Sequence, residues 1–168
     1  IRSLYERHGK DINFVGVIIT NENVTLADKR RSSSYAVKIA GMFGVDGLVI
    51  SEEGFGNPDA DLIMNCHKAE KAGIKTVLIT DEFAGRDGAS QSLADAAPEA
   101  NAVVTAGNAN MIVVLPPMER VIGFTEYVNV IAGGFDGSLK PDGSIEVELQ
   151  AITGATCELG FNKLGAET

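Results

Sequence analysis

Short, uninterrupted apolar runs alternate with helical patterns along the first two-thirds of this sequence, and no other feature restricts the fold as much. The runs lie at 14–19, 47–50, 74–79, 102–105 and 111–115. Strands that are apolar on both faces are typical of a parallel sheet with helices on both sides. We therefore predict an α/β fold with a doubly wound, mostly parallel sheet of the flavodoxin/Rossmann-like type and right-handed crossovers.

Two helices in this region have clear start and stop signals. The first is expected to start at Thr25, whose hydroxyl can cap the first turn, and to end at Gly44. The second is expected to start with Asn57 as its cap and Pro58 at the first helical position, and to end at Gly73. The expected buried faces are Val37, Ala40 and Phe43 in the first helix, and Leu62, Cys66 and Ala69 in the second.

The last third of the chain has a different pattern. A short helix is expected at 90–97, and strand-like segments follow at 127–132 and 144–152. The second of these segments alternates apolar and polar residues, as a strand with one exposed face does. We predict that these C-terminal segments of the chain add antiparallel strands, or an antiparallel edge, to the parallel sheet. Because repeats, low-complexity tracts and an obvious linker are missing, we predict a single domain over 1–168 with a polar lead-in at 1–11.

The charge balance argues against several classes of partner. The 14 basic and 23 acidic residues give a net charge of −9, which repels phosphate backbones and anionic lipids. No apolar run approaches the roughly 20 residues that span a bilayer, and the lead-in lacks the apolar stretch of a signal peptide. Two cysteines are too few for a disulfide framework, which indicates a reducing compartment. We expect a cytoplasmic protein that binds no nucleic acid and does not insert into membranes.

Polar, glycine-rich segments follow the expected strands at 20–25, 51–59, 80–88 and 105–110. In an open α/β sheet such segments meet beyond the carboxyl ends of the strands, where ligands bind. The candidate catalytic residues are two pairs of adjacent carboxylates, Glu52 with Glu53 and Asp81 with Glu82. Crowded carboxylates can share protons, act as acids or bases, or hold a cationic amine. Their spacing matches no known metal loop, so we predict no metal site.

Other polar side chains of the same segments are candidate contacts for a substrate or a partner surface. They are Asn21, Asn23, Asn57, Asp59, Arg86, Asp87, Ser90, Gln91, Asn108 and Asn110. The alternative interpretation is structural, because Asn and Ser commonly cap helices in strand-to-helix loops. We interpret Arg86 as an organiser of local ion pairs rather than an anion ligand. The Gly-Phe-Gly at 54–56 lacks the third glycine of a dinucleotide-binding loop.

Several of these segments also carry a family resemblance. The stretches 51–62 and 80–95 are similar to signatures of the pyruvoyl-bearing component of bacterial amino-acid reductases. Further similarity lies in Gly107–Asn110, Leu115–Met118, Val121–Gly123 and the tail Gly154–Phe161. From Ile12 onward the chain resembles the C-terminal fragment of that component, in the family that includes D-proline reductase and glycine/sarcosine/betaine reductase component B. Asn65-Cys66 and the stretch 135–138 favour D-proline reductase over the other members.

The resemblance implies covalent chemistry. In this family a proprotein is cut at an internal residue, usually a cysteine, which becomes a pyruvoyl group at the new N-terminus. The pyruvoyl carbonyl condenses with the substrate amine and weakens the bond between Cα and nitrogen. A selenocysteine selenolate on a partner subunit then attacks Cα. With D-proline the ring opens to 5-aminovalerate, a reaction of Stickland-type amino-acid fermentation.

The resemblance therefore implies a subunit of a D-proline reductase or, alternatively, of glycine/sarcosine/betaine reductase component B. Its expected partners in a hetero-oligomer are the other fragment of the same proprotein, a selenocysteine-containing subunit and the amino-acid substrate. The sequence starts at Ile1 without an initiator Met, and no Cys or Ser lies near that start to serve as the precursor. The pyruvoyl group is therefore expected upstream of residue 1 or on a partner chain. Cys157 is a candidate for exchange with the selenium centre, with a structural role as the alternative.

Two interpretations without covalent chemistry stay open. One is a non-catalytic, flavodoxin-like module that binds a small molecule at the same loop edge and folds and binds alone. The other is a structural subunit whose loops are interfaces. The enzyme hypothesis differs from both, because it predicts obligate partners and a carbonyl group within the complex.

Overall fold

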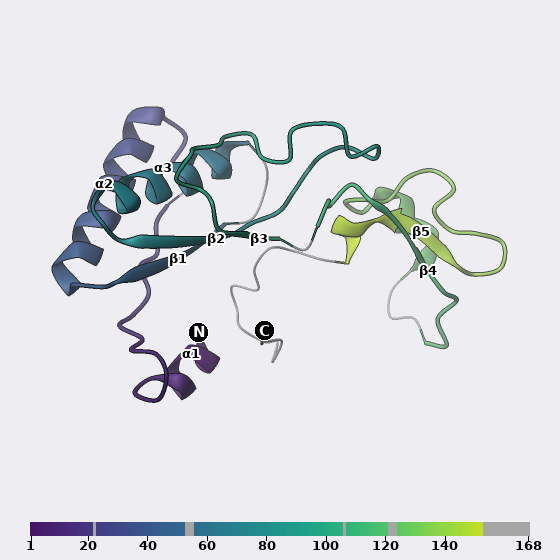
Figure 1. The fold of residues 1–168 in the computed structure, drawn as a ribbon. Coiled ribbons are helices and arrows are strands. Elements are labelled where there is room, and N and C mark those ends of the chain that lie inside the picture. Colours follow the sequence, from purple (N-terminus) through teal and green to yellow (C-terminus); the bar gives the residue numbers. More distant parts are fainter. Residues whose placement is uncertain (22, 53–55, 106, 121–123, 153–168) are drawn as a thin grey trace.

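The computed structural model describes residues 1–21, 23–52, 56–105, 107–120 and 124–152, and it contains two separate sheets (Figure 1). One is a parallel sheet beside two long helices, and the other is a two-stranded antiparallel sheet further along the chain. The predicted α/β class, with a mostly parallel sheet and antiparallel strands near the C-terminal end, is confirmed. The polar lead-in contains a short helix, α1 (Arg2–Arg7).

The parallel sheet has the strand order β1 (Gly47–Ser51), β2 (Lys75–Ile79), β3 (Val103–Val104). β1 and β2 pair along their whole length, in a register that sets Val49 beside Val77. β3 is only two residues long and pairs with the end of β2. These strands coincide with three of the predicted apolar runs, because each run is long enough for one strand and is bounded by polar residues or glycine.

Helix α2 (Leu26–Phe43) starts and ends where its capping residues predict. The Thr25 hydroxyl accepts a hydrogen bond from the Asp28 backbone N–H at 3.2 Å, and Gly44 ends the helix in the left-handed region at φ 63°. The predicted buried face is right for Ala40, which is 1% exposed, but wrong for Phe43, which is 65% exposed. Phe43 is the last residue of the helix, so little of the described molecule lies beyond it to cover the ring.

Helix α3 (Asn57–Lys71) is confirmed with its start shifted by one residue, because Gly56 is the N-cap and Asn57 is already helical. Gly56 has φ 88°, a conformation that glycine adopts readily. The predicted buried stripe of this helix is confirmed. Its residues pack with those of the neighbouring elements in two core clusters, Leu62, Ile63, Cys66 and Leu78, and Ala40, Ala69 and Ile74. Both α2 and α3 lie on the same face of the parallel sheet (Figure 1).

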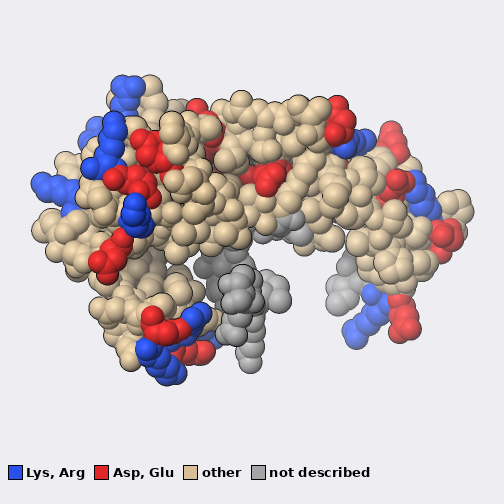
Figure 2. Space-filling model, in the orientation of Figure 1, with Lys and Arg blue, Asp and Glu red and all other residues tan. Residues whose placement is uncertain are grey.

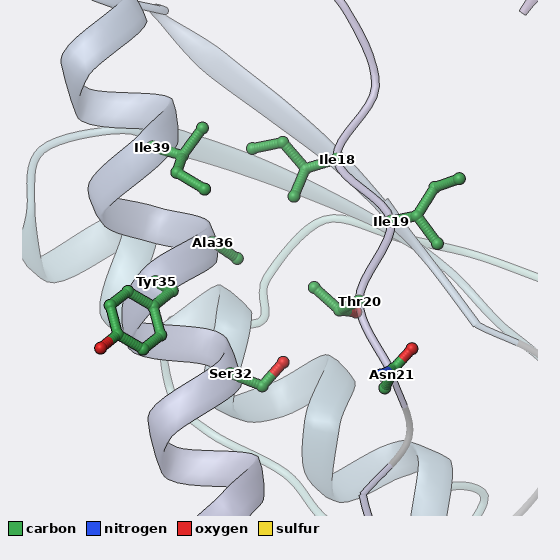
Figure 3. Close-up of a pocket in the computed structure, with 8 residues that line it drawn as sticks. All are labelled: Ile18, Ile19, Thr20, Asn21, Ser32, Tyr35, Ala36 and Ile39. Carbon is green, nitrogen blue, oxygen red and sulfur yellow. The ribbon is translucent and has the colours of Figure 1, made fainter.

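The predicted strand at 14–19 is wrong. This segment is extended, but it pairs with no strand among the described residues. It lies beside α2, where Ile18 faces Ile39 (Figure 3), and Ile19 is 90% exposed. An apolar run becomes a sheet strand only where other elements cover both faces and a neighbour completes its hydrogen bonds. Here α2 covers one side only.

The predicted helix at 90–97 is also wrong, and the reason is visible in its backbone hydrogen bonds. The Ser90 N–H donates to the Ala84 carbonyl at 2.9 Å, and the Ala94 N–H donates to the Asp59 carboxylate at 2.8 Å. In a helix that starts at Ser90, the Ala94 N–H would donate to the Ser90 carbonyl, but Asp59 accepts it instead. The segment is therefore tied to the preceding loop and to α3, and it forms bends and turns instead.

The antiparallel sheet consists of β4 (Ile112–Leu115) and β5 (Ile145–Glu148), and it is separate from the parallel sheet rather than an extension of its edge. The predicted strand at 127–132 is wrong, because Thr125–Val130 form the 3-10 helix η1. β5 is already paired with β4 along its whole length, so that side of β5 offers this segment no ladder. Of the predicted strand at 144–152, only β5 is extended, and the 3-10 helix η2 (Leu149–Ala151) follows it.

Charged side chains occur in small mixed groups on the face shown in Figure 2, without a continuous basic stripe. Within the described ranges, no helix has the length and apolar character that crossing a membrane requires.

Candidate functional site

Three of the four polar loops that were predicted to converge, those after β1, β2 and β3, meet at one edge of the sheet, beyond the carboxyl ends of the parallel strands; the described residues of the loop at 20–25 do not join them. The Glu52 N–H donates to the last carbonyl of β2 at 3.2 Å, and the Thr80 N–H donates to the last carbonyl of β3 at 3.1 Å. Further along, Glu82 and Asn108 form an isolated parallel bridge. Backbone hydrogen bonds therefore hold the three loops together beyond the carboxyl ends of the strands.

Glu52 and Asp59 are a pair of buried carboxyl groups at this edge. Glu52 is 9% exposed and Asp59 is 0% exposed. The Thr80 hydroxyl donates to Glu52 Oε1, and Asp59 Oδ2 accepts from the N–H groups of Gly56 and Ala94 at 3.0 and 2.8 Å. The other two oxygens, Glu52 Oε2 and Asp59 Oδ1, are buried and have no donor among the described residues. Each carboxyl group thus has one satisfied oxygen and one unsatisfied oxygen.

The two carboxyl groups interact directly, and a hydrogen bond between them requires a proton on one of them. Burial raises the pKa of Glu52 most strongly, whereas the Thr80 hydroxyl lowers it. The hydrogen bond and negative charge of Asp59, together with the charge of Asp81, raise the pKa of Glu52 further, to about 7. Near neutral pH the pair therefore holds one proton much of the time. A carboxyl group that titrates near pH 7 can donate or accept a proton in a reaction.

Lys29 of α2 is a buried cation that contacts the first turns of α3, and it was not among the predicted site residues. Its ammonium group bonds the Asp61 carboxylate and the Asn57 carbonyl, the latter at 3.0 Å. Lys29 is 2% exposed and Asp61 is 6% exposed. The spacing of residues along α2 could have indicated its burial, because Lys29 lies on the same face of the helix as Ser33 and Ala40, which are also buried. A buried charge requires a partner of opposite charge. The ion pair fixes α2 to the first turns of α3.

Glu82 and Asp81 lie in the loop after β2 and are half-buried. The Thr105 hydroxyl donates to the Glu82 carboxylate, and the Ala109 N–H donates to the Glu82 carbonyl at 2.7 Å. Asp81 lies close enough to Glu52 for its charge to act on the Glu52 pKa. Three of the four predicted carboxylates, Glu52, Asp81 and Glu82, are therefore brought to the same edge. The fourth, Glu53, lies outside the described residues.

Asn108 and Asn110 hold the loops at 80–88 and 105–110 together. These contacts are structural, which is the alternative to a role in binding a substrate or a partner. Asn108 accepts from the Ala84 N–H at 3.1 Å and donates to the Gly85 carbonyl at 2.7 Å. Asn110 accepts from the Gly85 N–H at 3.0 Å. Amide side chains that satisfy backbone groups in this way are positioned by the fold, and they in turn fix the 80–88 loop.

Arg86 connects the loop after β2 to the antiparallel sheet. Its Nε donates to Glu148 Oε1 of β5 at 2.8 Å, and its guanidinium lies 4.6 Å from the centre of the Phe135 ring. Glu148 also accepts from the side chains of Asn110 and Gln150. Burial opposes the ionised form, but the hydrogen bonds from Arg86, Gln150 and Asn110 lower the pKa of Glu148. Arg86 does form an ion pair, but its partner lies 62 residues further along the chain and not in its own loop, so the expected local pairing is replaced by a long-range one.

Most of the remaining predicted contacts are local. The Asp87 carboxylate accepts from the Ala89 N–H at 3.1 Å, and the Gln91 side chain donates to the Ala94 carbonyl at 3.2 Å. Ser90 is exposed and contributes its backbone N–H to the loop. Cys157 lies outside the described residues, so its role stays a prediction.

Asn21 lines a different surface feature, a groove between the extended segment 18–21 and α2 (Figure 3). Ser32 and Tyr35 form part of its helical wall. Asn23 packs back onto this segment, since its backbone N–H and its side chain donate to the Asn21 carbonyl at 3.0 and 3.2 Å. None of the candidate carboxylates lines the groove, so the structure separates these two asparagines from the carboxylate edge.

The carboxylate side chains beyond the ends of the parallel strands suit a cationic amine better than a metal ion or a carbonyl group. Among the described residues, no group of three or more His, Cys, Asp or Glu side chains could hold a metal ion. A pyruvoyl group presents carbonyl oxygens, which require hydrogen-bond donors. Glu52, Asp59, Asp81 and Glu82 are instead acceptors when ionised, and they suit a cationic amine. These four side chains, when ionised, therefore do not suit the carbonyl oxygens of a pyruvoyl group.

Comparison with known proteins places the chain in a family. The model of a family described as glycine/sarcosine/betaine reductase component B subunits matches residues 1–167. The chain belongs to this family. It is 67% identical, over 99% of its length, to the glycine reductase complex component B subunits alpha and beta of Peptoclostridium acidaminophilum. It is 68% identical, over 100% of its length, to the protein of the same name from Acetoanaerobium sticklandii. No solved structure matches the chain.

Other component B relatives are less similar. The sarcosine reductase complex component B subunit alpha of Peptoclostridium acidaminophilum is 56% identical over 99% of the chain, which covers 39% of that relative. The chain spans 39% and 40% of the length of the two glycine reductase relatives. It therefore corresponds to about two-fifths of these component B proteins.

The component B relatives support the alternative of the two reductase predictions better than the D-proline reductase prediction. Two of the residues that favoured D-proline, Asn65 and Cys66, have structural roles within α3. The Asn65 side chain donates to the Asp61 carbonyl at 2.9 Å within α3, and Cys66 is 0% exposed in the core. Both residues therefore reflect the packing of a helix, which several related proteins can share.

Proposed function

We propose that this chain is part of the component B subunit of a glycine reductase complex, which cleaves the C–N bond of glycine reductively. The observation that carries the proposal is the order of the identities. The chain is 67% and 68% identical to two glycine reductase component B proteins, but 56% identical to a sarcosine reductase subunit and 43% identical to a betaine reductase subunit. These substrates differ in the methylation of one nitrogen, so the graded identity favours the unmethylated amine.

The carboxylate edge supports this substrate class by its charge. An unmethylated ammonium group donates up to three hydrogen bonds, and half-buried carboxylates such as Asp81 and Glu82 can accept them. A quaternary ammonium group has no N–H to donate, so the same acceptors would recognise it by charge alone. We propose that Asp81, Glu82 and Glu53 bind the substrate amine and that the more deeply buried Glu52 supplies or takes up a proton.

Release of an amine from carbon requires a proton at nitrogen, and the Glu52–Asp59 pair holds one at near-neutral pH. The pair lies next to the charge of Asp81, at the edge where the substrate amine is proposed to bind. The reductant is not among the described residues of this chain. We propose that a selenocysteine-containing subunit supplies it and that the pyruvoyl group lies upstream of residue 1 or on a partner chain, as the resemblance implies.

The proposal includes a hetero-oligomer in the cytoplasm. Its members would be this chain, the other fragment of the same proprotein and the selenocysteine-containing subunit. Cys66 is a free, buried thiol in the core, and a reducing compartment suits a free thiol.

The first experiment is an intact-mass measurement of every chain in the native complex after borohydride treatment with an amino-acid substrate. A substrate-sized adduct with glycine, on the N-terminus of one chain, supports the proposal and identifies the chain that carries the carbonyl group. An adduct with D-proline alone would restore the D-proline reductase prediction and overturn the glycine proposal. The lack of any adduct from active material would instead favour the non-catalytic binding module. Parallel turnover assays with glycine, sarcosine, betaine and D-proline rank the substrates independently.

A further inference from the structure

The parallel sheet has one covered face and one open face among the described residues. The register sets Leu48 beside Thr76 and Ile50 beside Leu78, and these side chains point toward α2 and α3, where Ile50 packs with Leu78 in the core. Residues between them in sequence point to the other face, because side chains alternate along a strand. That open face carries Val49 beside Val77, and Ile79 beside Val104.

The open face is apolar and exposed. Val49 is 64% exposed, Val77 is 38% exposed and Val104 is 54% exposed. The four residues Val49, Val77, Ile79 and Val104 form two adjacent rows across the strands, which we call the open valine face. Its charged neighbour is Lys75 at the start of β2, whose side chain is 87% exposed. The patch is therefore a continuous apolar surface at the centre of the sheet with a charge at its rim.

A parallel sheet of this kind is stable when helices cover both of its faces. The helices α2 and α3 both lie on the other face, and the short helix α1 belongs to the polar lead-in (Figure 1). The strands themselves read as covered on both sides, since Leu48–Ile50 and Val77–Ile79 are unbroken apolar runs. Sequence and structure together thus indicate that a further element covers the open valine face.

We propose that an amphipathic helix covers the open valine face. This helix would come from the rest of the full-length protein, the part that corresponds to the regions of the relatives outside the match with this chain. The chain spans 39% and 40% of the two glycine reductase relatives, so about three-fifths of each relative is available to supply this helix. A helix with apolar residues at i, i+3, i+4 and i+7 presents a stripe that fits two adjacent rows of Val and Ile side chains. This proposal depends on family membership and not on the substrate.

The test is site-specific photo-crosslinking in the full-length protein, with a benzophenone amino acid at position 49 or 77. The control carries the same amino acid at position 42, because Met42 is 79% exposed on α2 and lies outside the open valine face. The expected result is that positions 49 and 77 crosslink to peptides from the unmatched three-fifths, whereas position 42 does not crosslink to those peptides. Crosslinks to the unmatched part support the proposal whether that part is still joined to this chain or is a separate fragment of the same proprotein. Crosslinks to a second copy of this chain, to a subunit from a different proprotein, or to nothing would each overturn the proposal.

A second measurement does not depend on the reach of the crosslinker. Thiol labelling of Val49→Cys in the native full-length protein should be about tenfold or more slower than labelling of Met42→Cys, because a covered site reacts only when it opens locally. Equal labelling rates at the two positions, in protein with an unchanged circular dichroism spectrum, would overturn the proposal.

Discussion

Glu52 and Asp59 face each other at the carboxyl end of the parallel sheet, each with one buried oxygen that has no donor among the described residues. The two carboxyl groups come from different elements. Glu52 directly follows β1, and Asp59 belongs to the first turn of α3, where it also accepts from the Gly56 N–H. A proton on Glu52 removes one of two neighbouring buried charges and permits a hydrogen bond to Asp59, so the local fold itself stabilises the protonated state of Glu52.

We predict a pH-dependent stability that the substitution Glu52→Gln removes. The pKa of Glu52 is raised from 4.5 to about 7 in the folded protein, so the folded state binds this proton more tightly than the unfolded chain does. The stabilising contribution is full below pH 4.5 and is lost as the pH rises to about 7. The amide that replaces the Glu52 carboxyl group stays neutral and can donate to Asp59 at every pH. The unfolding free energy of Glu52→Gln, relative to the native chain, should therefore rise between about pH 5 and about pH 8 in urea titrations. Glu126→Gln, at an exposed position, is the matched control, and a flat difference for both variants would contradict the prediction.

Thr80→Val should shift the titration of Glu52 to a higher pH. The Thr80 hydroxyl donates to the Glu52 carboxylate and lowers the Glu52 pKa, and valine keeps the shape of threonine without that donor. Thr80→Ser keeps the donor and is the control. The carboxyl carbon-13 chemical shift of Glu52, followed against pH by NMR, reports the titration. Identical midpoints in the Val and Ser variants would show that the hydroxyl has no effect on this proton.

Local patterns were sufficient to predict much of the fold. The strands β1 and β2 are short apolar runs between polar residues, and α2 has its own start and stop signals at Thr25 and Gly44. The segments at 14–19 and 90–97 have equally plausible local patterns, but the strand and the helix predicted for them were wrong. Their states depend on distant partners, such as the bond from the Ala94 N–H to Asp59. A pattern within a dozen residues contains no information about such a partner.

The candidate site was predictable to the same degree. The rule that loops meet at the carboxyl ends of strands led to Glu52, Asp81 and Glu82, because it follows from strand direction alone. It did not reveal that Asp59 pairs with Glu52. Nor did it indicate that Arg86 pairs with Glu148, which lies in a separate sheet. Both pairings are set by tertiary packing, and the burial that raises the Glu52 pKa is set by the same packing.

Lys29→Met should destabilise the protein strongly, by about 3–5 kcal/mol, because it leaves the Asp61 carboxylate buried without its cation. The double variant Lys29→Met with Asp61→Leu removes both charges from the interior. It should recover most of the loss, since two apolar side chains can pack where the ion pair was. Urea unfolding followed by circular dichroism measures both variants. Equal losses in the single and double variants would show that packing of the side chains, rather than the unpaired charge, is the cause.

Glu148→Ala should destabilise the protein by about 1–3 kcal/mol, because three side-chain donors, including that of Arg86, lose a buried acceptor. The control is Glu146→Ala on the same strand, which breaks the more exposed pair with Lys140 and should cost about 1 kcal/mol or less. The pKa of Glu148 is lowered in the folded protein. The difference between the two variants should therefore disappear as the pH falls below the ordinary Glu range through the folded pKa. A difference that persists in acid would argue against an ionised Glu148.

Asp81→Asn should weaken substrate binding in the assembled reductase. If Asp81 accepts a hydrogen bond from the glycine ammonium group, removal of its charge should raise the KM for glycine about tenfold, which is about 1.4 kcal/mol. The effect on kcat should be smaller, because the amine is bound before the C–N bond breaks. Asp46→Asn is the control, because Asp46 is exposed and lies just before β1, at the amino end of the strands and away from the carboxylates. Glu53→Gln should behave like Asp81→Asn if both carboxylates hold the amine. Wild-type KM values in both variants would remove the carboxylate edge from the substrate site, while the borohydride adduct would still report separately on the substrate and the carbonyl-bearing chain.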